Sequence, residues 1–571
     1  MNQKPNNLDI FVLCCFVVLI TLQPYYLYGK INLYEIGLYL PGINAILHGG
    51  VPYRDFFHLR GPFELYMPAF LMMISEKNIS VLSFYFYFGT VLTLIFLVFL
   101  GKELYQTRLI FCLMVPVLVA RTFPRVVFTY WGGMRYALGI LALYCAIKFF
   151  KRDKVLWIFF AGVASACGLF TSVEIGACAI VGILAALIFS SLFKLQERKI
   201  IIHAFFTYLF GIMLVVLPYL LYLVVTRSFI PYVDSVYAVV KNMQVVINPH
   251  FVSEYPSNAI EALKAMVIPT SKNFRHMTPS YLYIILLFYL INRIKNKKVT
   301  KVDLSIVCIG IYGFIMYNAG FRGIWAAQFE MALQPEKILL FFIFEEIYSF
   351  LQQRKEWINS QVASFEETKK EEGAKRLKVW AINIILLGFF VFSLSYAVDR
   401  YNKRFFAFKY LRNVISGKDT AKIMPFSQDE SRPLKIGRAR GMVVPLRQAE
   451  ELEAIVDFFS RNTRPDEVVF MYPELGTYSF LIDRPFLGRF PIATFSWFDD
   501  TWHKEFVSDL KRVRPRFVVV LKDFPPDWEK VYLAPKQNRE KYREVMDIIE
   551  SEYHLETTTP SSYIYKTKRR G

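Results

Sequence analysis

Five ionisable residues stand close together in the segment 30–76, directly after the first long apolar run of the chain. Ionisable groups beside a lipid bilayer are costly, so residues that stand there usually serve a function. We therefore take this segment as the candidate site. The five residues that we single out in it are Glu35, Asp55, His58, Arg60 and Glu64.

The two carboxylates that could remove a proton are Glu35 and Asp55. Glu35 follows the apolar run by a few residues, where partial desolvation makes a carboxylate a better proton acceptor at neutral pH. Asp55 stands in PYRDFFHLRGP, whose proline and glycine residues break helices on both sides. This loop could present Asp55, His58 and Arg60 to one point. A solvated interfacial glutamate and a structural histidine are the alternatives.

Two carboxylates and a histidine could also hold a loosely coordinated divalent cation such as Mg²⁺ or Mn²⁺. The spacing of these residues is not typical of a metal site, and the sequence contains neither CxxC nor HExxH. We therefore predict no specific metal ligands.

Arginines gather in or beside loops that we expect on the outer side, where basic residues are disfavoured. The guanidinium fork suits phosphate oxygens, so the set as a whole favours an anion site near the outer leaflet. For any single arginine, pairing with lipid headgroups or carboxylates is the alternative. The set is Arg54, Arg60, Arg121, Arg125, Arg135 and Arg322. Glu174, at a tight outer turn, and Gln328, at the helix junction near Arg322, are candidate supporting residues, as are Arg54 and Arg121.

Membrane-spanning helices must position these residues, and the composition predicts such helices. The 571 residues are 55% hydrophobic with a mean hydropathy of +0.34, whereas soluble chains contain about 45–50% apolar residues. The shorter run 62–75 carries two prolines and predicts an interfacial helix. Runs of membrane length predict about eleven spanning helices, over 9–28, 79–101, 107–120, 133–148, 155–170, 174–193, 203–226, 279–292, 302–319, 334–351 and 378–397.

Positive charge predicts the orientation of these helices. The segments 148–154, 194–199, 293–301 and 353–376 are rich in lysine and arginine, which places them and the N-terminus in the cytoplasm. The first apolar run lacks a small-residue cleavage site and predicts an anchor in the cell (inner) membrane. The net charge of +20 is largely explained by these loops, so we do not expect nucleic acid as a partner.

The chain divides into a transmembrane domain, 1–398, with a charged cytoplasmic loop at 353–376, and an extracytoplasmic soluble domain, 399–571. From about residue 447 helical and strand patterns alternate, and 554–568 predicts a terminal hairpin, so we expect a small α/β domain. Its glycines lack the spacing of a nucleotide site. All seven cysteines fall in predicted membrane helices, which leaves the outer domain without a disulfide framework.

The first outer loop resembles that of the membrane-embedded GT-C glycosyltransferases, which include protein O-mannosyltransferases and the aminoarabinose transferase of lipid A. The resemblance rests on an acid after the first helix, Glu35, a G-x-x-Y-x-D turn at Gly50–Asp55, and Gly61-Pro62 before an interfacial helix. The segments around Arg135 and Arg322 are also similar to family segments. Family members frequently have two adjacent acids after the first helix, whereas this chain has Tyr34-Glu35.

The resemblance implies inverting transfer of a sugar from a polyprenyl-phosphate donor to an extracytoplasmic lipid, glycan or protein acceptor. In such a reaction Glu35 or Asp55 would be the base, and His58, Arg60, Arg135 and Arg322 would bind the donor phosphate. Which carboxylate acts, and whether a divalent metal takes part, stays open.

Two other classes of protein are compatible with many helices. A transporter of an anionic or lipid-linked substrate usually has charged residues at mid-membrane and repeated halves. Here the ionisable residues gather at outer helix ends and no repeat is evident. A non-catalytic envelope-assembly protein that binds ligands through its outer domain is the third candidate.

Overall fold

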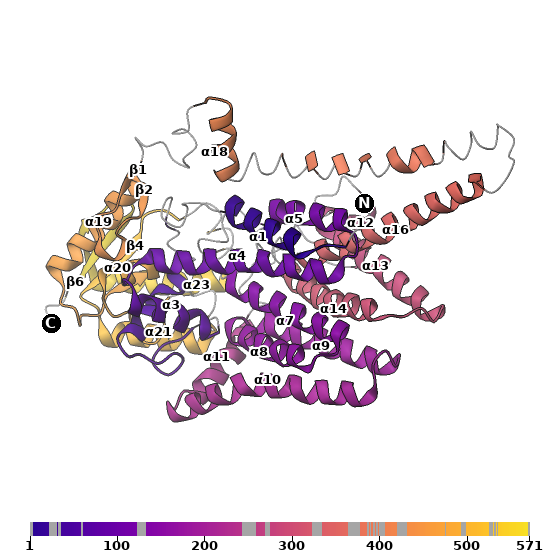
Figure 1. Cartoon of the computed structure of the whole chain (residues 1–571). Coiled ribbons are helices and arrows are strands. Elements are labelled where there is room, and N and C mark those ends of the chain that lie inside the picture. The colour runs from indigo at the N-terminus through magenta and orange to yellow at the C-terminus, as the bar shows by residue number, and fades with distance from the viewer. Residues whose placement is uncertain are drawn as a thin grey trace.

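The computed structural model describes residues 4–21, 31, 36–58, 61–122, 133–242, 259–268, 274–322, 334–363, 406–418, 431–473, 475–492, 498–524 and 535–568, with parts of 377–398 and the single residues 529 and 533. Within these ranges, a bundle of long helices lies beside a smaller region of strands and short helices (Figure 1). The described residues are thus helical in the N-terminal part of the chain, and they form both helices and strands in the C-terminal part.

Ten of the predicted apolar runs coincide with a helix, which confirms the polytopic helical character. Four of these helices, α4, α7, α9 and α10, are long and apolar enough to cross a membrane. The eleventh run, 378–397, is described only in part, and the number of spans stays a prediction. The ten helices are α1 (Asn7–Thr21), α4 (Ile79–Leu104), α5 (Arg108–Thr122), α7 (Gly133–Arg152), α8 (Val155–Thr171), α9 (Val173–Leu192), α10 (Arg198–Val225), α13 (Phe274–Lys295), α14 (Lys301–Arg322) and α16 (Gln334–Ala363).

Shorter helices lie between the long ones and after them. The segment expected to form an interfacial helix is α3 (Phe63–Ile74), which has Pro68 inside it. It is preceded by a 3-10 turn, η2 (Ile36–Leu38), and by α2 (Leu40–Leu47). The others are α11 (Phe229–Asn242), α12 (Ala259–Val267) and α18 (Phe406–Ile415).

Helices α4 and α7 pack with their backbones in close approach. A Cβ on Gly89 would lie 2.2 Å from the Met134 amide nitrogen, and one on Gly133 would lie 2.3 Å from the Thr90 amide nitrogen. Small residues at helix crossings permit such contact in membrane proteins. Glycines therefore fix where the first turn of α7 meets α4.

Ion pairs join the loops at one end of the bundle. This end includes the start of α1 and the turns after α4, α7 and α9, which the charge pattern places together in the cytoplasm. Figure 1 shows the N-terminus at the end of the bundle remote from the strands. Which face is cytoplasmic stays a prediction. The pairs are Arg108–Asp9 (2.6 Å), Arg152–Glu103 (2.9 Å) and Lys301–Asp153 (2.5 Å).

The C-terminal region is built around a four-stranded mixed sheet in the order β3-β4-β6-β5. Strand β3 (Phe470–Tyr472) runs parallel to β4 (Phe517–Leu521). The predicted hairpin is confirmed as β5 (Tyr553–Thr558) and β6 (Ser562–Thr567), with β6 antiparallel to β4. A separate pair, β1 (Ser431–Pro433) and β2 (Val443–Pro445), is antiparallel.

Helices cover both faces of this sheet. The central strand β4 is therefore buried on both sides, which explains why its sequence, FVVVL, is apolar throughout. Phe517 and Val519 pack in one buried cluster with α19 (Leu446–Asn462) and with α20 (Gly476–Ile482). Val518 and Val520 pack in another with α21 (Asp500–Val513) and α23 (Lys536–Glu552). Successive strand residues face opposite sides, so both sets are buried.

A buried carboxylate ties α19 to the β5–β6 turn. Glu451 is buried and accepts hydrogen bonds from the hydroxyls of Tyr478 (3.1 Å), Thr559 (2.9 Å) and Ser562 (2.7 Å). It also accepts one from the Ser561 amide (2.7 Å). Four donors compensate the cost of burying the charge.

The segment between α1 and α3, which we predict to face outward and call the first outer loop, packs tightly against the bundle at Gly61. Its amide donates to the Thr171 carbonyl (3.3 Å), and an added Cβ would lie 1.9 Å from the Phe170 carbonyl oxygen. Only glycine fits at this point without displacing backbone, so Gly61 fixes the loop against the end of α8.

We expect Glu451→Ala to destabilise the C-terminal region by about 3 kcal/mol, because it removes the acceptor shared by three buried hydroxyls and the Ser561 amide. Hydrogen exchange at the amides of β5 and β6 in the intact protein measures this loss. The exposed neighbour Glu450→Ala is the matched control, expected within about 0.5 kcal/mol of the native protein. Equal exchange in both variants would contradict a structural role for Glu451.

We expect Gly61→Ala to displace the first outer loop, since overpacking against backbone costs about 1–3 kcal/mol. Protease cleavage within 51–61 should become faster in the purified protein, and its thermal midpoint should fall. Gly437→Ala is the control, because nothing lies within 4 Å of the added Cβ. Unchanged cleavage of the Gly61→Ala variant would show that the loop is held elsewhere.

Candidate active site

The first outer loop lies between the helical bundle and the C-terminal region. Its apolar residues Tyr39, Ile43, Phe56 and Leu65 belong to the same buried cluster as β4 and α19. The Phe57 amide donates to the Arg489 carbonyl (2.7 Å). The loop is therefore packed on both sides over the part that the structure describes.

A polar clamp joins α2 to the C-terminal region at Asp483, which follows α20 in a left-handed conformation (φ 52°). Asp483 pairs with Arg438 (2.6 Å) and accepts a hydrogen bond from the Asn44 side chain (3.2 Å). Arg438 also donates to the Asn44 side-chain oxygen (2.7 Å). The three side chains are thus mutually bonded, and a ring nitrogen of His48 lies 3.5 Å from Asp483.

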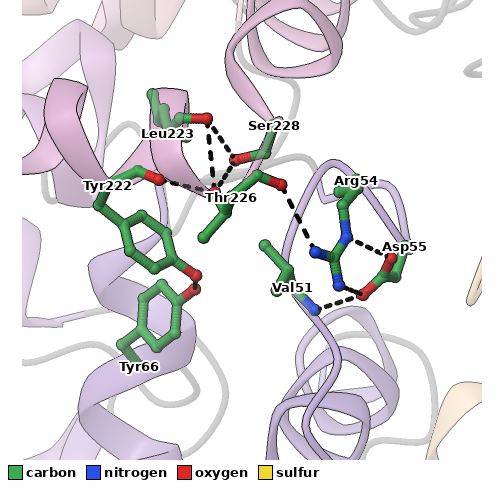
Figure 2. A network of polar contacts seen from close by, with 8 residues as sticks. All are labelled: Val51, Arg54, Asp55, Tyr66, Tyr222, Leu223, Thr226 and Ser228. Atoms are coloured by element: carbon green, nitrogen blue, oxygen red, sulfur yellow. Dashed lines mark hydrogen bonds and ion pairs between the residues drawn. The ribbon is translucent and has the colours of Figure 1, made fainter.

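Asp55 is held inside its own turn. Its carboxylate accepts two hydrogen bonds of 2.7 Å from the Arg54 guanidinium and one of 2.8 Å from the Val51 amide (Figure 2). Arg54 lowers the pKa of Asp55 chiefly through this hydrogen bonding. A carboxylate whose pKa is lowered is a weaker proton acceptor, so this arrangement favours a structural role for Asp55.

The Arg54–Asp55 pair faces the turn between α10 and α11. Arg54 reaches the Thr226 carbonyl (3.5 Å), while Tyr66 of α3 and Tyr222 of α10 point their hydroxyls at one another (2.5 Å; Figure 2). These contacts attach both ends of the loop to α10.

His58 is buried in the loop, three residues after Asp55. Its ring lies edge-on to Tyr39, with 6.0 Å between the centroids, and Tyr39 in turn packs on Phe86 of α4 at 5.0 Å. His58 therefore belongs to the part of the loop that covers the outer turn of α4.

Glu64 lies in the first turn of α3 and is fully buried. It interacts electrostatically with Tyr85 of α4, the neighbour of Phe86. We expected an interfacial helix here but assigned no role to Glu64. The sequence pattern around Glu64, a glutamate in the first turn of a helix after Gly61-Pro62, does not predict its burial. The same pattern is found at exposed helix ends.

Arg135 is also buried, in the first turn of α7. Its guanidinium donates to the Tyr136 hydroxyl (3.2 Å) and stacks on that ring at 4.8 Å. The preceding turn residue, Gly133, would place a Cβ 2.7 Å from the Phe86 carbonyl. Each of the three buried residues is thus linked to residues 85–86 of α4 by a different route. Glu64 interacts with Tyr85, the His58 ring contacts Tyr39 and through it Phe86, and the α7 turn that carries Arg135 approaches Phe86 through Gly133.

The other predicted site residues are not gathered by the described structure. Glu174 is exposed in the first turn of α9. Arg121 and Arg322 stand near the ends of α5 and α14, but their side chains lie outside the described part. Glu35, Arg60 and Gln328 lie outside the described residues altogether.

No group of three histidine, cysteine, aspartate or glutamate residues lies within metal-binding reach among the described residues. Asp55 and His58 are the described members of the set that could bind a divalent cation. Because Arg54 occupies both carboxylate oxygens of Asp55, these residues do not fit a resident metal.

Comparison with family models and with curated proteins gives no match. Among solved structures, the oligosaccharyltransferase of Archaeoglobus fulgidus, in complex with Zn and sulfate, is similar with a TM-score of 0.51 at 11% identity. The match covers 89% of this chain and 67% of that one.

ArnT from Cupriavidus metallidurans, an aminoarabinose transferase, also matches, over 98% of this chain and 97% of its own length. The TM-score is 0.49 at 11% identity for its apo state, and 0.48 at 10% identity with undecaprenyl phosphate bound. At these identities the comparison establishes the fold alone. The chain has the fold of the archaeal oligosaccharyltransferase.

Proposed function

We propose that the protein is a membrane glycosyltransferase of the inverting type. It transfers a sugar from a polyprenyl-phosphate donor to a lipid, glycan or protein acceptor outside the cytoplasm. The observation that carries the proposal is that His58, Glu64 and Arg135 are all buried, on segments that each approach residues 85–86 of α4. This arrangement occurs in a fold shared with an oligosaccharyltransferase.

The proposed orientation follows from charge. The loops joined by ion pairs at one end of the bundle face the cytoplasm with the N-terminus, and the first outer loop and C-terminal region face outward. The donor's polyprenyl chain lies in the bilayer, which brings its phosphate to headgroup level near the outer helix ends.

In the proposed reaction the acceptor oxygen or nitrogen attacks the anomeric carbon while a carboxylate takes its proton and the lipid phosphate departs. We assign the base to Glu35 in preference to Asp55, because Arg54 and the Val51 amide already occupy the Asp55 carboxylate. Asp55 then shapes the turn that carries His58. No metal ion enters this assignment.

The departing phosphate gains negative charge and needs fixed positive charge close by. Arg135 supports this role best among the described residues, because it is a buried arginine in the first turn of α7, and that turn packs closely on α4. His58 is a second donor, and Arg60 and Arg322 complete the proposed phosphate site. Arg121, Glu174 and Gln328 stay candidates for binding the acceptor.

The burial of Glu64 favours a positioning role for its carboxylate. It stands between the turn bearing His58 and Tyr85 of α4. A negative charge at this depth also draws guanidinium groups toward the outer end of α4. We therefore place Glu64 beside the phosphate site as a residue that orients the arginines.

Sugar transfer by purified protein, supplied with radiolabelled polyprenyl-phosphate sugars, tests the base. Glu35→Gln should lower the rate by about 10²–10⁴-fold, since it removes general base catalysis. Asp55→Asn should cause a much smaller loss, together with faster proteolysis of residues 51–58.

Two outcomes would contradict this assignment. A loss with Asp55→Asn equal to that with Glu35→Gln would make Asp55 the base or an equal partner. Movement of intact lipid-linked sugar across the membrane by native protein, without transfer to any acceptor, would favour the transporter class instead.

Arg135→Gln should lower the rate of transfer by about 10²-fold, because one donor to the growing phosphate charge is lost. Arg135→Lys should retain part of the activity, since lysine keeps the positive charge but lacks the forked guanidinium group that binds two phosphate oxygens at once. Steady-state kinetics with varied donor concentration measures both variants. Arg198→Gln, an exposed arginine at the start of α10, is the matched control. Loss of folding in Arg135→Lys with unchanged kinetics in the remaining protein would assign Arg135 to structure alone.

A further inference from the structure

Helix α18 separates apolar from basic side chains. Leu411, Val414 and Ile415 stand at positions i, i+3 and i+4, which share one face of a helix. Lys409 and Arg412 are three residues apart on the other side of the helix. The short helix is therefore amphipathic.

The apolar face of α18 is open in the isolated chain. Leu411 is 57% exposed, Val414 53% and Ile415 77%. Three adjacent large apolar side chains on one helix form a surface that water does not solvate well. Something other than the described part of the chain must cover this face.

The position of α18 identifies what covers it. The helix lies against α1, and Figure 1 shows its axis crossing the direction of the long helices α4 and α10, beside the boundary between the bundle and the strands. It also follows the predicted last span, 378–397. A helix placed there runs along the surface of the membrane.

We propose that α18 is an interfacial helix that inserts its apolar face into the leaflet on the strand side of the bundle. Its basic face then meets anionic lipid headgroups. Lys409, Arg412 and the exposed Lys418 just after the helix supply the positive charge that suits phosphate groups. The occupant is the lipid bilayer, and the contact anchors the chain between the last predicted span and β1.

Thiol reactivity of the full-length protein in lipid nanodiscs tests this proposal. A membrane-impermeant maleimide should label Leu411→Cys and Ile415→Cys about tenfold more slowly than Ser416→Cys. Burial in lipid raises the pKa of a thiol, and a rise of about one pKa unit lowers the fraction of reactive thiolate about tenfold at constant pH. Ser416 is the matched control, because it is exposed and follows Ile415 directly. Native protein, labelled in the same way, measures the background labelling of the seven native cysteines.

A second measurement distinguishes lipid from protein as the cover. A bimane label on the Ile415→Cys variant should be quenched by brominated lipids, and anionic lipid should increase the quenching. Labelling as fast as that of Ser416→Cys would overturn the proposal, because the helix would then be free in water. Slow labelling without quenching would also overturn it, in favour of a protein partner or second copy. Neither outcome depends on whether the protein transfers sugar.

Discussion

The placement of Asp55, His58 and Glu64 depends on how the first outer loop is packed. Apolar residues within 36–58 and 61–72 share one cluster with the sheet and α19 of the C-terminal region, and the Asp483–Arg438–Asn44 clamp adds polar contacts at the same boundary. On the other side, Gly61 lies against the end of α8 with no space for a side chain. A loop held on both faces keeps its short polar segments in fixed positions, which a site for directed chemistry requires.

This packing divides the charged residues of the loop into two groups. Arg54 and Asp55 satisfy each other and face the turn after α10, where they stabilise the loop. His58 and Glu64 are buried toward α4, where the first turn of α7 brings Arg135. Burying charged groups is costly unless they interact with one another or with a ligand. The proposed phosphate site uses the second group, and the first group supports the loop that carries it.

The elements of the C-terminal region could be predicted from the sequence, and the site could be predicted only in part. Strands such as β4 and helices such as α21 follow from local apolar periodicity, which acts within a few residues. The ion pair between Asp55 and the neighbouring Arg54 is also local. The sequence does not reveal, however, whether either residue pairs instead with a residue far away in the chain, so this pair could not be predicted. The burial of Glu64 depends on α4 lying over α3, and no pattern near residue 64 contains that information.

The sequence by itself determined the helical membrane character, the order of elements and the α/β nature of the last part, because hydropathy and periodicity are properties of short segments. Tertiary structure alone decided which of these segments meet. Asn44 and Asp483 are 439 residues apart and bonded to each other, and Gly61 contacts the end of α8 because α3 and α8 pack side by side. Such contacts arise from the global minimum of packing free energy over all segments. They therefore appear only when the whole chain is folded.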